Sequence, residues 1–403
     1  MGKVISQSKV KRKKIKKLKT KMEKSRQFSK LSAYFEKQLL IHFNYIPVNH
    51  SKRRQLVSYI ALIIFISVTI KTIVFTLLPA DNPILYYLGD ATIEFGAIRT
   101  PLDCMLSIWT LGGLYCGLFL KYTNQSVKHQ HWVRVNQLLN TKSPAEMKVI
   151  KLFLHQTQSN LILAFLVTVG LNIPLLFQCP PGFYSLNIVY LGLHGVAGFL
   201  VSAYAINFAF FFGLDMFFVA RRFKSYYRSL KTLVRYKAIS DFKRDTLIRR
   251  SVRHITSQLK QIIETYHFWE KLNHACFISS FINQSLILYL VFCSPTRQDL
   301  KIVLSVYGLL NCATGQSLHF ISANYAQKQI DHAISQLHNA NTKTSQIKTK
   351  LENLNFLEYV DQRKYFTIFG SLEYSSKNLV TVTIENAATL LLLVTNLGYR
   401  QIF

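Results

Sequence analysis

The sequence predicts an all-α polytopic membrane protein with seven transmembrane helices, a cytosolic N-terminus, an extracellular C-terminus and a helical anchor on the inner side. Charged residues make up only 17% of the 403 residues, and hydrophobic residues make up 50%. Soluble domains carry about 25% charged residues. Apolar runs of about 20 residues, the length that crosses a bilayer as a helix, recur along the chain. The 49 Lys and Arg residues outnumber the 19 acidic residues and fall in alternate connections between these runs.

Seven segments are apolar and long enough to cross about 30 Å of hydrocarbon. They are Gln55–Leu78, Pro101–Leu120, Leu152–Phe177, Leu186–Val219, Ala275–Phe292, Lys301–Ala323 and Leu379–Leu397. The fourth is long enough to tilt, or to continue as a helix beyond the bilayer.

The basic residues fix the expected orientation. Residues 1–54, 121–151, 220–274 and 324–378 together hold 44 of the 49 Lys and Arg residues, and the opposite side holds four. Short cytosolic loops retain basic residues, so the N-terminus is expected inside. This orientation is opposite to that of a G-protein-coupled receptor.

The parts outside the predicted spans are of two kinds, a basic N-terminal segment and two segments with helical periodicity. Residues 1–54 form a strongly basic cytosolic segment, which is expected to contact anionic lipid of the inner leaflet. It lacks interleaved aromatic residues and precedes a membrane span, so nucleic acid is not an expected partner. Residues 221–272 and 324–378 repeat apolar residues at helical spacing, which predicts a cytosolic extension of the 55–323 bundle and a separate set of anchor helices. This periodicity is equally consistent with subunit assembly and with helices that cover their own bundle.

The chain shows no sign of an enzyme. It contains no nucleophile elbow, zinc-protease helix, P-loop or dinucleotide fingerprint. The polar residues within the spans are not spaced as a catalytic pair, and no cofactor is expected.

Residues 379–403 hold the most polar of the predicted spans. Thr381, Glu385, Thr389 and Asn396 recur at close to fourfold spacing, which places several of them on related faces of a helix. One bundle could bury such a stripe. If several copies surround an axis, the same stripe would line a wet conduit, with Glu385 as a ring that favours cations and Leu393 within a hydrophobic constriction.

Aromatic residues gather near the predicted outer ends of the spans, as in a pocket for a small organic ligand. An interfacial aromatic belt would give the same pattern. The candidate ligand-binding residues are Tyr86, Phe177, Tyr190, His194, Tyr289 and Tyr307.

A short motif and the topology resemble the insect and arthropod gustatory and odorant receptor superfamily. The stretch FTIFGSLEYS, Phe366 to Ser375, resembles the FxIDxSLxYS-like segment that leads into the last helix of gustatory receptors. Phe369 stands in place of the usual Asp, and the TYhhhhhQF signature of the last helix is absent. The chain is thus similar to a divergent gustatory-receptor-like protein.

The resemblance implies a ligand-gated, non-selective cation channel of the plasma membrane, assembled as a homotetramer or as a heterotetramer with related subunits. A small-molecule ligand would bind in the outer half of each subunit. The last helix would line the pore through Glu385, Thr389, Leu393 and Asn396. The alternatives are a protein of the same fold with a trafficking, scaffold or developmental role and, third, a G-protein-coupled receptor.

Overall fold

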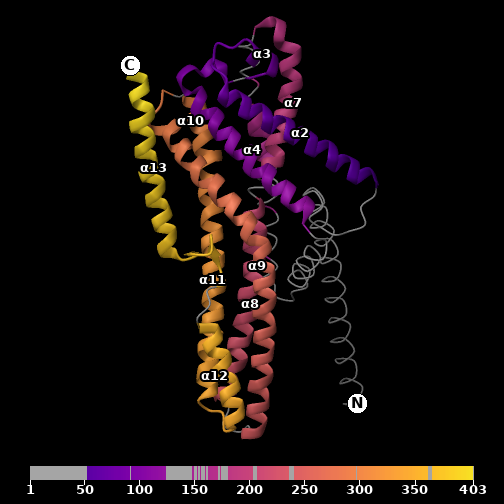
Figure 1. The fold of residues 1–403 in the computed structure, drawn as a ribbon, viewed down its shortest axis with the longest axis vertical. Coiled ribbons are helices and arrows are strands. Elements are labelled where there is room, and N and C mark those ends of the chain that lie inside the picture. The colour runs from indigo at the N-terminus through magenta and orange to yellow at the C-terminus, as the bar shows by residue number, and fades with distance from the viewer. Residues whose placement is uncertain are drawn as a thin grey trace, which may run out of the picture.

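The computed structural model is helical throughout, apart from one short hairpin (Figure 1). It describes residues 52–90, 92–123, 162–170, 180–202, 207–235, 240–295, 297–361 and 365–402, and five single positions between 148 and 173. The basic segment 1–51, most of the third predicted span and the connection 124–147 lie outside the described residues.

The elements follow one another along the chain with these bounds. They are α2 (Lys52–Leu77), α3 (Ile84–Leu88), η1 (Ile93–Ile98), α4 (Arg99–Tyr122), η2 (Pro181–Phe183), α7 (Tyr184–Val201), α8 (Asn207–Arg235), α9 (Asp241–Phe292), α10 (Gln298–Val303), the π-helical η4 (Leu304–Leu309), α11 (Leu310–Asn341), α12 (Ile347–Asp361), β1 (Thr367–Ile368), β2 (Leu372–Glu373) and α13 (Ser376–Ile402).

Five described helices are long and apolar enough to cross a membrane by length and composition: α2, α4, the segment Pro181–Val201, α9 and α13. The sixth predicted span is divided among α10, η4 and α11, and the fourth between α7 and α8. The predicted outer connections and the end of α13 share one end of the molecule, and α12 lies at the other (Figure 1).

The inner half is a bundle of helices that continue out of the predicted spans. The 52 residues of α9 correspond to about 78 Å of helix at 1.5 Å per residue, far more than a bilayer needs. On α11, Ala323, Ala326, Ile330, Ala333, Leu337 and Ala340 are fully buried, and they repeat in alternating steps of three and four. Such a seam fits the close packing of two long helices, and α8 and α11 form the most extensive helix pair. The predicted anchor segments therefore do pack together.

A two-stranded antiparallel hairpin, β1–β2, connects the anchor to α13. Its turn residues, Phe369 and Gly370, both have positive φ, 53° and 73°. A bulky residue is a rare occupant of this left-handed conformation, whereas Asp and Asn tolerate it. Contacts with α9 support Phe369: its ring stacks on that of His274 at 4.4 Å, and its backbone N–H donates to His274 Nε2 at 2.8 Å. The aromatic residue that replaces the usual Asp is therefore held by packing.

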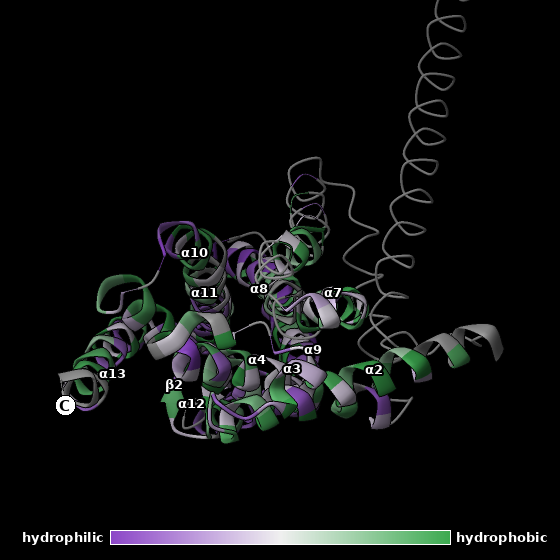
Figure 2. Ribbon diagram, turned by 90° about the horizontal axis from the view of Figure 1, so that it is seen from above, coloured by the Kyte–Doolittle hydropathy of each residue, from purple (hydrophilic) through white to green (hydrophobic). Residues whose placement is uncertain are grey.

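Helix α13 lies at the edge of the molecule, both from the side and from above (Figures 1 and 2). Only 11% of the apolar stretch within this helix is buried against the rest of the chain. It contacts mainly α9, where Asn386 accepts a hydrogen bond from the Ser285 hydroxyl at 3.1 Å. One subunit therefore leaves most of its last helix uncovered.

Candidate ligand cavity and last helix

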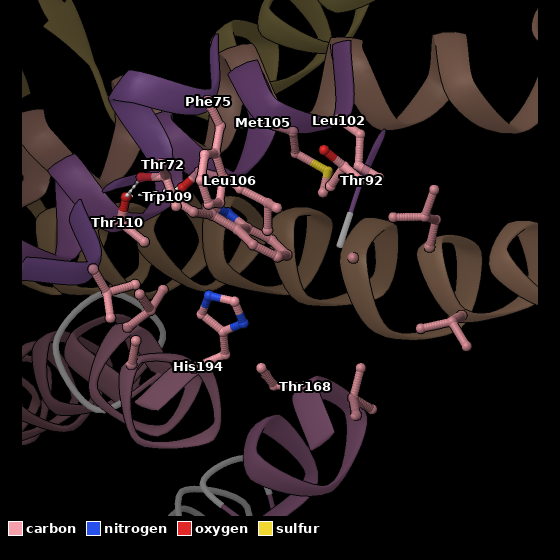
Figure 3. A pocket seen from close by; sticks show the side chains of 18 of the residues that line it. Thr72, Phe75, Thr92, Leu102, Met105, Leu106, Trp109, Thr110, Thr168 and His194 are labelled. Carbon is pink, nitrogen blue, oxygen red and sulfur yellow. Dashed lines mark hydrogen bonds between the residues drawn. The ribbon is translucent and has the colours of Figure 1, made fainter. Parts of the chain in front are cut away.

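A cavity of about 180 Å³ lies in the outer half, between α2, α4, α7, the helical residues 162–170 and the α10–η4 segment (Figure 3). Most of its wall is apolar. The lining side chains include Val68, Phe75, Leu102, Met105, Leu106, Trp109, Val201 and Leu304, with polar groups from Thr72, Asp90, Thr92, Thr110, Thr168 and His194. A mostly apolar cavity with a few polar groups is typical of a site for a small organic molecule.

Small residues bring the helices of the cavity wall close together. A Cβ atom added at Gly198 of α7 would lie 2.1 Å from Thr168 Oγ1. The close contact between the third predicted span and α7 therefore requires a glycine at this position. On the opposite wall, the hydroxyls of Thr72 and Thr110 share a hydrogen bond of 3.1 Å between α2 and α4. Figure 3 shows both walls facing the open space.

A buried ionic cluster closes the outer end of the cavity. Arg99, at the start of α4, donates through Nη2 and Nε to Asp90 Oδ2 at 2.8 and 3.1 Å, and its Nε lies 3.5 Å from Asp103 Oδ2. It also donates to the carbonyls of Phe75, in the last turn of α2, and of Leu78, directly after the helix, where carbonyls have no partner within the helix. Arg99 therefore joins the end of α2 to the start of α4.

Thr92 completes this cluster and leaves Asp90 without a free acceptor oxygen. Its hydroxyl lies 2.5 Å from Asp90 Oδ1 and 2.8 Å from Asp103 Oδ1, and its backbone N–H donates to Asp90 Oδ1 at 2.8 Å. The three charged side chains are all at most 5% exposed. Asp90 is thus bound through both oxygens, whereas Asp103 Oδ2 has no hydrogen bond among the described residues and lies 3.5 Å from Arg99 Nε.

Two basic side chains, Lys71 and His194, lie in or beside the cavity wall. Lys71 of α2 is 8% exposed, and its ammonium has no hydrogen-bond partner. It lies 3.8 Å from the centroid of the Tyr190 ring and 5.4 Å from that of Phe75. His194 points from α7 toward α4 across the cavity (Figure 3). The His194 ring is stacked with the ring of Tyr190, and their centroids are 6.4 Å apart.

Of the four candidate ligand-binding residues whose side chains the structure describes, only His194 lines the cavity. Tyr86 instead stacks on Phe183 at 5.8 Å. Tyr190 covers Lys71 and donates its hydroxyl to the Tyr87 carbonyl at 3.1 Å, and Tyr289 is buried in a cluster with Leu300 and Leu304. Phe177 and the side chain of Tyr307 lie outside what the structure describes.

The sequence analysis did not identify Trp109, Met105, Thr72 or the Arg99 cluster as parts of the site. One signal was available: Lys71 is a basic residue within an otherwise apolar span, and such residues usually face the bundle and mark functional sites. Among the residues that the structure describes, no three His, Cys, Asp or Glu side chains lie together as they would around a metal ion.

The polar residues of α13 occupy an uncovered flank of the helix. Glu385 and Asn396 are exposed, and Thr389 is half-buried. Leu393 instead packs, with Leu390 and Val394, against the cluster formed by α4, α9 and α10. The structure therefore brings three of the four candidate pore residues onto one flank and turns Leu393 inward, because helical geometry places it about 80° from Glu385.

Another uncovered apolar surface lies on the inner anchor. Ile347, Leu351 and Leu354 of α12 are 76%, 55% and 45% exposed and share one face of the helix. Helix α12 lies at the end of the molecule opposite α3 and the end of α13 (Figure 1), which is the cytosolic end in the orientation expected from the sequence.

Comparison with solved structures identifies the architecture. The chain matches the olfactory receptor OR5 of the insect Machilis hrabei with a TM-score of 0.66 at 12% identity, over 91% of this chain and 99% of the receptor. The chain has an insect olfactory-receptor fold. The same receptor in complex with eugenol matches with a TM-score of 0.63 at 12% identity, over 93% and 99% of the two chains. No protein-family model and no curated protein matches the sequence.

Because the likeness covers 91% of this chain, it extends over nearly the whole architecture rather than one part of it. The shared fold is a membrane-receptor fold, which agrees with the apolar helices of this chain. At 12% identity the likeness concerns the fold, so the roles of individual residues depend on the geometry described above.

Proposed function

We propose that the chain is a chemosensory receptor subunit that is itself a ligand-gated, non-selective cation channel of the plasma membrane. The single observation that carries this proposal is the uncovered α13, which presents Glu385, Thr389 and Asn396 on one flank while its opposite face packs on the bundle. Polar side chains that face lipid are unfavourable. Around an axis shared by several subunits, the same flank would line an aqueous path.

Self-association is supported by the exposed apolar stripe of α12 at the inner end. A second copy, or a related subunit, would cover this stripe and bring several α13 helices to one axis. We infer a tetramer, homomeric or mixed, as the resemblance implies. In this arrangement Leu392, which is 62% exposed and lies within about 20° of Glu385 on the helix, replaces Leu393 as the apolar pore residue.

The cavity in the outer half would hold the ligand. A ligand that binds the open state more tightly than the closed state shifts the equilibrium toward conduction. The 366–375 stretch favours a gustatory-like rather than an olfactory role. Contact of residues 1–54 with anionic lipid is a further part of this proposal.

Replacement of Glu385 by Gln tests the channel. Cells that express the chain alone would be screened with small organic molecules, and currents would be recorded in mixed cation solutions. Glu385→Gln should alter cation permeability ratios or conductance, because it removes a ring of charge. Glu358→Gln, an exposed glutamate of α12, is the matched control.

Currents that are unchanged by Glu385→Gln at equal surface expression would remove this residue from the conduction path. If the wild-type chain binds ligands in its cavity but carries no current, a trafficking, scaffold or developmental role would be favoured instead.

A further inference from the structure

The turn of the β1–β2 hairpin is held by an imidazole of α9. The backbone N–H of Phe369 donates to His274 Nε2 at 2.8 Å, and the two rings stack with their centroids 4.4 Å apart. A backbone N–H only donates, so Nε2 must be the unprotonated nitrogen of a neutral imidazole. A protonated His274 carries hydrogen on both ring nitrogens and offers no acceptor. This hydrogen bond therefore exists in only one protonation state of His274.

The turn needs this contact more than the rest of the hairpin does. Phe369 has a φ of 53°, which bulky residues rarely adopt, and its side chain is 52% exposed, so burial of its own ring contributes little. The base of the hairpin is fixed separately, because Ile368 is fully buried and the Tyr266 hydroxyl donates to the Thr367 carbonyl at 2.6 Å. Loss of the hydrogen bond to His274 would therefore act on the turn and leave the base in place.

The surroundings of His274 set the pH range in which the contact holds. His274 is half-buried and precedes the predicted fifth span. Burial lowers the pKa of its imidazole from the ordinary value of about 6.5, and the negative charge of Glu270, one turn earlier on α9, acts in the opposite direction. The hairpin faces the imidazole with the uncharged Phe369, whereas the acidic Glu373 lies on β2 opposite Thr367. Because the pKa is lowered, the neutral imidazole and its hydrogen bond are present at neutral pH. Acidification below about pH 6.5 works against them.

We propose that His274 is a proton-sensitive contact that holds the turn before α13, and that acidification of the predicted cytosolic side releases this turn. The hairpin connects the inner anchor to α13 (Figure 1), so a change at its turn reaches the start of the last helix. An aspartate at position 369 would tolerate the left-handed conformation by itself, whereas Phe369 relies on its contacts with α9. This inference goes beyond the proposed channel function and does not require that the chain conducts.

Hydrogen–deuterium exchange of the full chain in nanodiscs, resolved at the Phe369 amide, tests the contact without any recording of current. After correction for the intrinsic pH dependence of exchange, the wild-type amide should exchange about two- to tenfold faster at pH 5.0 than at pH 7.5, the range that corresponds to one hydrogen bond. His274→Phe keeps an aromatic ring but has no acceptor, so its Phe369 amide should exchange fast at both pH values. His274→Gln offers an amide oxygen that does not titrate, so protection should persist at both.

His267→Gln is the matched control, because His267 lies on the same helix, has its Nδ1 3.3 Å from the Glu270 carboxylate and is 72% exposed. This variant should keep the wild-type response to pH. Equal protection of the wild-type amide at pH 5.0 and pH 7.5 would overturn the proposal, and so would a response to pH that survives in His274→Gln. Loss of protection in His274→Gln at both pH values would assign the turn to ring stacking instead, which also overturns it. A pH-dependent turn in a chain that carries no ligand-evoked current would leave this inference standing and contradict the channel.

Discussion

Replacement of Arg99 by Met should destabilise the outer half of the bundle more than any exposed ion-pair variant does. Arg99 donates four hydrogen bonds to Asp90 and to the carbonyls of Phe75 and Leu78. Methionine replaces the unbranched aliphatic stem of arginine without its guanidinium group, so it leaves the Asp90 and Asp103 carboxylates buried without their cation. It also leaves the last carbonyls of α2 without donors.

The magnitude follows from burial. Removal of one partner from a buried pair costs about 3–5 kcal/mol. With an unfolding entropy of about 2.1 cal/mol/K per residue, a chain of 403 residues should lose about 4–6 °C of melting temperature. The melting temperature of Arg99→Lys should lie between those of the wild type and Arg99→Met, because lysine retains the charge but cannot form the forked contact with Asp90.

Thermal unfolding of the purified chain in one detergent measures this difference, with Arg297→Met as the matched control. Arg297 makes the same kind of two-point contact with Asp299, at 2.8 and 3.2 Å, but the two side chains are 49% and 62% exposed. Exposed pairs contribute less than about 1 kcal/mol, so the control should shift by about 1 °C or less. Equal shifts for Arg99→Met and Arg297→Met would refute the idea that the buried cluster joins α2 to α4.

Two further predictions concern packing within and between subunits. Gly112→Ala should lower stability by about 1–3 kcal/mol in the same thermal assay, because the added Cβ would lie 2.1 Å from Ser279 Oγ where α4 meets α9. Gly192→Ala, which has nothing within 4 Å of its added Cβ, should not lower stability. Equal effects of the two variants would contradict the close approach of α4 and α9. Leu351→Glu should reduce the fraction of oligomer measured by size-exclusion chromatography with light scattering. Lys348→Glu, at an exposed residue of the same helix outside the apolar stripe, should leave that fraction unchanged. An oligomer insensitive to Leu351→Glu would rule out the α12 stripe as its interface.

Hydropathy predicted several helices closely because their apolar runs end in loops. The predicted spans Gln55–Leu78 and Pro101–Leu120 correspond to α2 and α4, and Leu379–Leu397 lies within α13. Helical periodicity also predicted the inner part of α9, where Ile248, Ile255 and Leu259 are buried. The predicted fifth span and most of the helical extension predicted at residues 221–272 form a single 52-residue helix, α9.

The site was harder to predict from the sequence, because it depends on contacts between distant segments. Aromatic residues near the predicted outer ends of the spans led us to expect a ligand pocket in that half of the molecule. The structure has a cavity there, but Tyr86, Tyr190 and Tyr289 do not line it. The partners of Arg99 lie on α2 and in the α3–η1 connection, and only the folded chain brings them together. On α13, fourfold spacing predicted that Glu385 and Thr389 share a flank of the helix, whereas Leu393 packs inward because it belongs to another face.

Single-particle imaging of the purified chain in nanodiscs tests the central claim most directly, because it reports both particle symmetry and the position of α13. A channel predicts a fourfold particle in which the α13 helices surround the axis and present Glu385 to it, with α12 in the contacts between subunits. A monomer, or a dimer with α13 on its periphery after gentle extraction, would contradict a shared pore.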